Sequence, residues 1–152
     1  MDNTAKNKAI VRRWFEEVWN KGQEATIDEL FPSIGVAYGL GDTATEVRGP
    51  EQIKPFVRNL RSAIPDLRID VDDIVAEGDR VVVRLTLKGT HSGGAMGVAA
   101  SGHRVHISGL VLVRVSGDQI VEGWNNWDQL SFLRQIGALP AAANDRFLTA
   151  ST

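Results

Sequence analysis

Residues 117–128 read Gly-Asp-Gln-Ile-Val-Glu-Gly-Trp-Asn-Asn-Trp-Asp, the most informative segment of the chain. Its opening Gly-Asp predicts a turn, and residues 119 to about 125 predict the last strand of a sheet. Apolar residues at helical spacing then precede Gly137, a residue typical of the end of a helix. We therefore expect a strand that leads into a closing helix at about residues 129–136.

Upstream of this stretch, apolar and polar residues alternate along three segments, at residues 67–72, 80–89 and 103–115. Alternation with a period of two is typical of strands that bury one face. A turn at residues 77–79 joins the first two segments, and a Gly-rich passage at residues 92–102 leads into the third. The second half of the chain therefore predicts an antiparallel sheet.

The first half of the chain shows helical periodicity instead. A first helix has one wide apolar stripe, formed by Ile10, Val11, Trp14, Phe15 and Val18. Gly22 marks its end, a second short helix spans about residues 24–31, and a third begins at residue 49 or near Pro55. The glycines of residues 33–48 indicate a short strand or an extended passage at the rim of a pocket.

Helices first, then antiparallel strands, then a helix is the order of an α+β fold. We expect a curved antiparallel sheet wrapped around the N-terminal helices, with a central cavity between them. The chain has 152 residues, 43% hydrophobic and 24% charged, which suits one globular domain. We place this domain at residues 1–139 and a loosely ordered tail at residues 140–152.

The composition excludes several classes of function. The 17 Lys and Arg residues stand against 19 Asp and Glu, so the net charge of -2 leaves no basic surplus for a nucleic acid partner. The absence of Cys excludes disulfides, thiolate nucleophiles and cysteine-bound metals. No apolar stretch reaches the roughly 18 residues of a membrane span, and residues 1–8 do not open a signal peptide. We expect a cytoplasmic protein without a membrane partner.

The three histidines do not predict a metal site. His103 and His106 are three residues apart on a predicted strand, where a period of two sends their side chains to opposite faces. His91 would still need a carboxylate to complete a site. The match of residues 39–44 to a dinucleotide-binding motif lacks the strand, turn and helix that this motif needs. We expect neither a metal nor a cofactor.

The four tryptophans form two pairs near opposite ends of the chain. Trp14 belongs to the stripe of the first helix, and Trp124 lies on the last predicted strand. We expect these two to meet at one cavity. Trp19 and Trp127 do not belong to the apolar stripe of the helix or to the predicted strand, so we expect them to pack at helix ends.

Several segments, taken in order, resemble the SnoaL-like polyketide cyclase family of the NTF2-like superfamily. The C-terminal signature of this family runs approximately G-x-I-x-E-x-W, three residues, D, and then a helix that ends Q-L-G. Residues 117–137 resemble it, with Ile136 in place of the usual Leu. Further matches are Val18-Trp19-Asn20, Arg48-Gly49, Pro65-Asp66-Leu67, residues 77–81 and Gly89-Thr90-His91. The resemblance covers about residues 8–137.

The resemblance implies an α+β cone with an apolar pocket, commonly dimeric, so we expect a homodimer that binds a hydrophobic small molecule. The best-studied members close polyketide rings by cofactor-free intramolecular aldol chemistry, and an aspartate that matches Asp128 acts there as acid and base. A carboxylate suits abstraction of an α-proton from a dicarbonyl. Asp128 also stands immediately before the last predicted helix, where an N-cap aspartate is expected. Both roles stay open.

Aldol closure also needs a hydrogen-bond donor for the developing enolate oxygen, and the candidates are His106, Tyr38, Asn126 and the indole N–H of a Trp. We assign the catalytic role to His106, and the other donors stay open. The face of its strand suits a pocket wall, and it suits a solvent-exposed or dimer surface equally well. The residues expected to bind the substrate are Trp14, Val18, Tyr38, Phe56, His91, Trp124 and Asn126.

Two alternatives remain beside a cyclase. An isomerase or an epoxide hydrolase uses the same scaffold, although the hydrolase needs a second acid near Asp128 that the sequence does not identify. A small-molecule-binding or dimerisation module without chemistry would use Asp128 only as a helix cap.

Overall fold

The computed structural model describes residues 2–41, 46–94 and 97–139, so the predicted tail at residues 140–152 lies outside the described residues. The helical elements are α1 (Thr4–Arg13), the π-helix η1 (Trp14–Asn20), α2 (Glu24–Leu30), α3 (Gly49–Ala63) and α4 (Gln129–Gln135). The strands are β1 (Val36–Tyr38), β2 (Glu46–Arg48), β3 (Arg68–Glu77), β4 (Arg80–Thr90), β5 (Arg104–Ser116) and β6 (Gln119–Trp127). The predicted α+β fold is confirmed.

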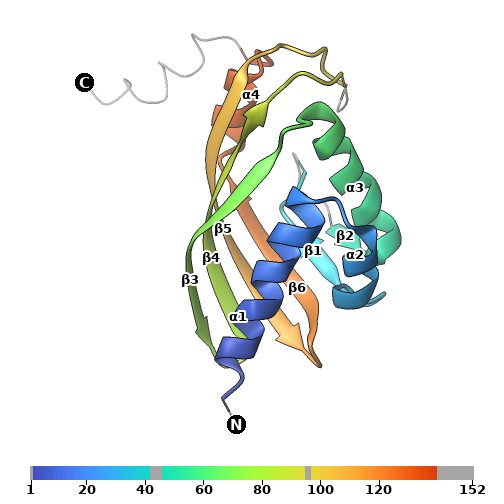
Figure 1. Ribbon diagram of the computed structural model, residues 1–152, viewed down its shortest axis with the longest axis vertical. Helices are drawn as coiled ribbons and strands as arrows, with labels where there is room; N and C mark the ends of the chain where they lie inside the picture. The colour runs from blue at the N-terminus through green and yellow to red at the C-terminus, as the bar shows by residue number, and fades with distance from the viewer. Residues whose placement is uncertain (1, 42–45, 95–96, 140–152) are drawn as a thin grey trace, which may run out of the picture.

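The six strands form one sheet in the order β2-β1-β6-β5-β4-β3. The strands β3 to β6 pair antiparallel with their sequence neighbours, as predicted. The short strand β1 instead lies parallel to β6, with Val36 opposite Glu122, so the sheet is mixed rather than wholly antiparallel. Figure 1 shows a curved sheet with α1, α2 and α3 on one side and α4 near the end farthest from the N-terminus.

The alternation of the long strands separates a core face from an outer face. On β4, the buried residues are Val81, Val83, Leu85 and Leu87. Every second residue of β5 is buried in the same way from Val105 to Val115. The intervening positions lie on the opposite face and are half-buried or exposed, with Arg84 and His106 among the exposed ones. The core therefore lies between the helices and one face of the sheet, because a strand with period two buries only alternate side chains.

The third helix runs without a break from Gly49 to Ala63, with Pro50 in its first turn and Pro55 inside it. It therefore begins at the earlier of the two predicted starts. Among the described residues, no helix is both long enough and apolar enough to span a membrane.

Candidate functional site

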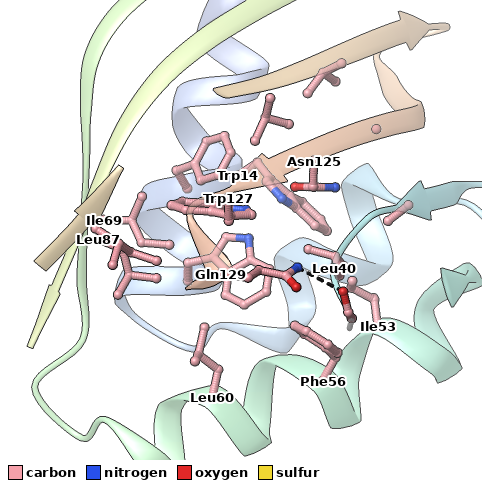
Figure 2. A pocket seen from close by; sticks show the side chains of 18 of the residues that line it. Trp14, Leu40, Ile53, Phe56, Leu60, Ile69, Leu87, Asn125, Trp127 and Gln129 are labelled. Atoms are coloured by element: carbon pink, nitrogen blue, oxygen red, sulfur yellow. Dashed lines mark hydrogen bonds between the residues drawn. The ribbon is translucent and has the colours of Figure 1, made fainter. Parts of the chain in front are cut away.

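A cavity of about 360 Å³ lies between the helices and the inner face of the sheet. Its walls come mainly from η1, from α3, from the inner faces of β3 to β6 and from α4. Figure 2 shows Trp14, Trp127, Asn125 and Gln129 around this space, with Phe56 and Leu60 of α3 on the opposite side. The central cavity predicted from the sequence is therefore present.

Aromatic rings form much of the cavity wall. Trp14 stacks on Phe31, with ring centroids 5.7 Å apart and an interplanar angle of 29°. Trp19 meets Phe56 edge-on, with centroids 6.2 Å apart and an angle of 84°. Offset-stacked and edge-to-face pairs at these separations are favourable arrangements of aromatic rings. The pairs link η1 to the segment after α2 and to α3, so they hold the wall together as well as lining it.

The π-helix explains why two tryptophans five residues apart line one cavity. In an α-helix, residues five apart lie roughly 140° apart around the axis, so Trp14 and Trp19 would face different directions. Hydrogen bonding from residue i+5 to residue i brings such residues onto nearly the same side. The N–H of Lys21 donates such a bond to the carbonyl oxygen of Glu16 at 3.1 Å. The wider turn therefore directs both indoles into the cavity.

Asn20 fastens this π-helix to the edge of the sheet. Its Nδ2 donates to the carbonyl oxygen of Ile69 at 2.9 Å, and its Oδ1 accepts from the N–H of Ile69 at 2.6 Å. Ile69 lines the cavity, so this pair of bonds joins two walls. Asn20 also donates to Glu16, and this bond, with the charge of nearby Arg68, holds the pKa of the Glu16 carboxyl below its usual value.

The polar side chains in the cavity wall are the amides of Asn125 and Gln129. Nδ2 of Asn125 donates to the carbonyl oxygen of Tyr38 at 3.0 Å. Nε2 of Gln129 donates to the carbonyl oxygen of Gly41 at 2.9 Å, a bond drawn in Figure 2, and to that of Gly39 at 3.4 Å. Asn125 therefore holds the end of β1 against β6, and Gln129 holds the segment after β1 against α4.

None of the described residues that line the cavity carries an ionisable side chain. Its indole rings, those of Trp14, Trp19 and Trp127, each carry an N–H that can only donate. Within the part of the chain that the structure describes, none of these N–H groups donates to a protein acceptor. Apart from these N–H groups and the two amides, the described cavity wall is apolar.

Asp128 lies beside this cavity, in a shallow hollow that adjoins it. Gly41, Asn125, Trp127 and Gln129 line both spaces, and Asp128 lines only the hollow. Its Oδ1 accepts from the N–H of Ser131 at 3.1 Å, so the carboxylate caps α4 as the cap alternative predicted. Its role as acid and base stays a prediction.

His106 lies on the outer face of β5, away from the cavity. Its side chain is exposed, whereas the neighbouring Ile107 lines the cavity. Its backbone N–H donates to Oε1 of Gln135 at 2.8 Å, and its carbonyl oxygen accepts from Nε2 of the same residue at 3.0 Å. The structure therefore does not bring its imidazole to the cavity, and the outer-surface alternative fits the placement of this side chain.

The residues predicted to bind substrate are divided by the fold. Trp14 and Phe56 line the cavity, and Val18 is buried behind its wall. Asn126 is exposed and lines the adjoining hollow. His91 is only 1% exposed, and its Nδ1 accepts from the N–H of Ser101 at 3.2 Å, so it lies at the base of the loop between β4 and β5.

The expected meeting of Trp14 and Trp124 is wrong. Because β6 alternates, Gly123, Asn125 and Trp127 face the cavity. Trp124 faces outward and stacks on Tyr38, with ring centroids 5.9 Å apart. Trp19 and Trp127, which we expected to pack at helix ends, line the cavity together with Trp14.

The predicted binding residues leave out most of the cavity wall, including Trp19, Asn125, Trp127 and Gln129. For the residues of β6, a partial signal was present: a period of two groups Gly123, Asn125 and Trp127 on one face, although it does not tell which face is inward. For Trp19, no such signal existed, because a π-helical turn is not encoded in an apolar stripe.

No group of three or more metal-ligating side chains occurs within residues 2–41, 46–94 and 97–139. The residues that line the cavity are apolar apart from the two amides and the indole N–H groups. The site therefore combines an apolar cavity with the carboxylate of Asp128 beside it.

A family model described as SnoaL-like polyketide cyclase matches residues 9–136. A protein of Jannaschia sp. CCS1, assigned to the SnoaL-like polyketide cyclases, is 27% identical and superposes with a TM-score of 0.82 over 92% of this chain and 97% of its own. AclR of Streptomyces galilaeus, assigned as a hydroxylase, is 29% identical, with a TM-score of 0.77 over 90% of this chain and 99% of its own.

IdmH of Streptomyces antibioticus, assigned as a polyketide cyclase, is 30% identical, with a TM-score of 0.74 over 87% of this chain and 99% of its own. No curated protein matches the chain significantly. The family model spans most of the chain, and it agrees with the fold, the apolar cavity and the resemblance read from residues 117–137. The chain belongs to the SnoaL-like polyketide cyclase family.

Proposed function

We propose that this chain is a cofactor-free enzyme that closes a ring in a hydrophobic carbonyl compound by intramolecular aldol chemistry, with Asp128 as its acid and base. One observation carries the proposal. Among the described residues that line the cavity or the adjoining hollow, Asp128 alone has an ionisable side chain. A proton transfer at this site therefore depends on its carboxylate or on solvent.

The cavity supports a substrate of this class. Its volume of about 360 Å³ lies in the range of small-molecule sites, which are mostly apolar with a few polar groups that orient the ligand. The indole N–H groups of Trp14, Trp19 and Trp127 supply donors for a carbonyl oxygen. An enolate oxygen carries more negative charge than the carbonyl from which it forms, so such donors stabilise it more strongly.

The carboxylate of Asp128 can combine capping with proton transfer because it has two oxygens. Oδ1 accepts from the N–H of Ser131, and no residue of the described chain donates to Oδ2. In the proposed reaction, Oδ2 removes an α-proton from the substrate, and the enolate carbon attacks a second carbonyl carbon of the same molecule. A carbon–carbon bond forms, and the new alkoxide takes the proton back from Asp128.

Exchange of α-protons with solvent tests the first step without knowledge of the natural substrate. The probe is β-tetralone, a two-ring ketone, followed by NMR in heavy water. The Asp128→Asn variant should keep the helix cap, since Asn and Asp cap helices about equally well. We expect it to lose the exchange that the natural chain adds to the solvent rate, by a factor of about 100 or more.

Asp73→Asn is the matched control for this experiment. Asp73 is exposed, and its Oδ1 accepts from the N–H of Ile74 at 3.1 Å, but it lies on β3 away from the cavity. This variant should exchange β-tetralone protons at the natural rate. Undiminished exchange in Asp128→Asn would overturn the proposed role of Asp128.

A second candidate function is ligand binding without chemistry. It is favoured by the lack of ionisable side chains among the described lining residues of the cavity itself. In that case, β-tetralone should bind with equal affinity to the natural chain and to Asp128→Asn, and neither should exchange protons above the solvent rate. An isomerase on this scaffold would also use Asp128 to move an α-proton, so exchange that depends on Asp128 separates a cyclase or an isomerase from a binding module. An epoxide hydrolase activates water instead of a C–H group, so this exchange does not report on that alternative.

A further inference from the structure

We propose that Gly109 and Trp127 set the size of ligand that the cavity accepts. The missing side chain of Gly109 lets the indole of Trp127 lie flat on β5, and the depth of that ring fixes the free width of the cavity. This inference rests on the proposed function in one respect, namely that the ligand binds in the cavity.

The two residues face each other across neighbouring strands. Gly109 of β5 and Trp127 of β6 are paired in the antiparallel register. A Cβ atom at position 109 would lie 2.4 Å from Cε3, 2.6 Å from Cδ2 and 2.7 Å from Cζ3 of the Trp127 ring. These separations are far below the van der Waals contact of about 3.5–4.0 Å between carbon atoms. The six-membered ring of the indole therefore occupies the space that a side chain at position 109 would need.

Position 109 needs a glycine because of this contact with Trp127, and not because of its backbone conformation. Gly109 does not belong to the glycines with positive φ in the described chain. Its neighbours on the same face, Ile107 and Val111, both direct side chains into the cavity wall. A side chain at position 109 would be expected there from the alternation of the strand. Gly109 is thus a gap in a row of apolar side chains, and the Trp127 ring fills it.

The position of this ring controls the cavity because the opposite wall is a helix. Figure 2 shows Trp127 facing the space whose other side is formed by Phe56 and Leu60 of α3. Lifting the ring from β5 would move it toward that helix and narrow the space. A smaller ring would widen it.

A series of ketones with one, two and three fused rings tests this proposal, namely cyclohexanone, β-tetralone and its linear three-ring homologue. Dissociation constants are measured by calorimetry for the natural chain and for Gly109→Ala, Trp127→Phe and the double variant. Gly109→Ala should weaken binding of the three-ring ketone by about tenfold relative to cyclohexanone, and Trp127→Phe should strengthen it by a similar factor.

The double variant keeps the test decisive if Gly109→Ala folds poorly. Phe keeps a δ carbon next to Cγ but lacks the fused ring that carries Cε3 and Cζ3 of the indole. Adding Gly109→Ala to Trp127→Phe should therefore change the dissociation constants less than adding it to the natural chain. The matched control is Gly94→Ala, because Gly94 also lacks a positive φ and a Cβ there would meet nothing within 4 Å. That control should bind all three ketones like the natural chain.

Two results would overturn the proposal. Equal changes in affinity for all three ketones in each variant would show that the pair does not select by size, even if Asp128-dependent exchange persists. Failure of all three ketones to bind the natural chain would overturn both this proposal and the cavity as the ligand site.

Discussion

Asp128 connects the end of β6 to the first turn of α4, and its two carboxylate oxygens have different surroundings. Oδ1 accepts from Ser131, whereas no donor within the described residues reaches Oδ2. Its backbone N–H donates to the carbonyl oxygen of Ser108 at 3.0 Å, which fixes the residue against β5. Oδ1 therefore serves the helix cap, and Oδ2 is left for the proposed proton transfer.

Substitution of Asp128 by Ala should show the structural contribution. Asp128→Ala removes the cap, so we expect its free energy of unfolding to fall by about 1 kcal/mol, while Asp128→Asn should stay close to the natural value. Urea denaturation followed by circular dichroism measures both. Equal destabilisation by Ala and Asn would contradict the cap and would make loss of exchange in Asp128→Asn uninformative about chemistry.

Single positions were predicted from the sequence with uneven success. The cap at Asp128 was predictable, because an aspartate directly before a helical pattern has a local physical role. The choice between Trp124 and Trp127 was not made correctly, because one step along a strand reverses the face. The sequence around both is Trp-Asn-Asn-Trp, in which either tryptophan could face inward.

At the level of elements, η1 is held at its C-terminal end by Arg61 of α3. Nη1 of Arg61 donates to the carbonyl oxygen of Trp19 at 2.7 Å and to that of Asn20 at 2.8 Å. Carbonyls at the end of a helix lack partners within the helix, so this guanidinium satisfies two of them. It also joins the two helical walls of the cavity.

Arg61→Ala should therefore destabilise the fold. Loss of the donor leaves two partly buried carbonyl oxygens without this partner, so we expect the free energy of unfolding to fall by about 1–3 kcal/mol. Arg58→Ala is the control, because Arg58, on the same helix as Arg61, forms an exposed ion pair with Glu24 of α2. This control should change stability by less than about 1 kcal/mol. Similar effects from both variants in urea denaturation would contradict this role of Arg61.

The helices and long strands were predictable because their periodicities are local. The apolar stripe from Ile10 to Val18 predicts a helix, but it fits an α-helical and a π-helical end equally well. The stripe therefore could not reveal the wider turn that directs Trp19 inward. The parallel pairing of β1 with β6 depends on contacts between residues about 86 apart in sequence, such as Val36 and Glu122, which no local pattern encodes.

At the scale of the whole molecule, ion pairs and hydrogen bonds to carboxylates tie separate elements together. Side-chain hydrogen bonds from Arg13 and Thr26 hold the pKa of Glu17 below its ordinary value. A hydrogen bond from the N–H of Thr90 likewise lowers the pKa of Asp66, and one from the ammonium of Lys88 lowers the pKa of Asp70. Each group binds a proton less readily in the folded chain than in the unfolded chain.

These lowered pKa values predict loss of stability in acid. As pH falls below the ordinary carboxyl values of 4.5 for Glu17 and 3.8 for Asp66, the unfolded chain takes up protons first, so the free energy of unfolding decreases. We expect it to be highest well above these values and to fall steadily toward about pH 3 in urea titrations.

Asp66→Asn checks the origin of this acid sensitivity. It removes one of the lowered carboxyls, so its stability should change less between about pH 5 and pH 3 than that of the natural chain. An identical pH dependence in the two proteins would contradict the contribution of Asp66. The homodimer implied by the family resemblance also stays a prediction, and light scattering of the purified chain measures it.

The overall architecture was predictable because the order of helices and strands determines which layers can form. The lining of the cavity was not, since it depends on the inward face of each strand and on the pitch of η1. These long-range choices place Trp19 and Trp127 beside Trp14 and send Trp124 to the outer face.

The account depends on the cavity as the ligand site, and nitrogen–proton correlation NMR of the indole groups tests this directly. The chain has four tryptophans, so four indole signals can be assigned with single Trp→Phe variants. On titration with β-tetralone, the signals of Trp14, Trp19 and Trp127 should shift, and that of Trp124 should remain in place. Shifts confined to Trp124, or no shift in any of the four, would contradict the account.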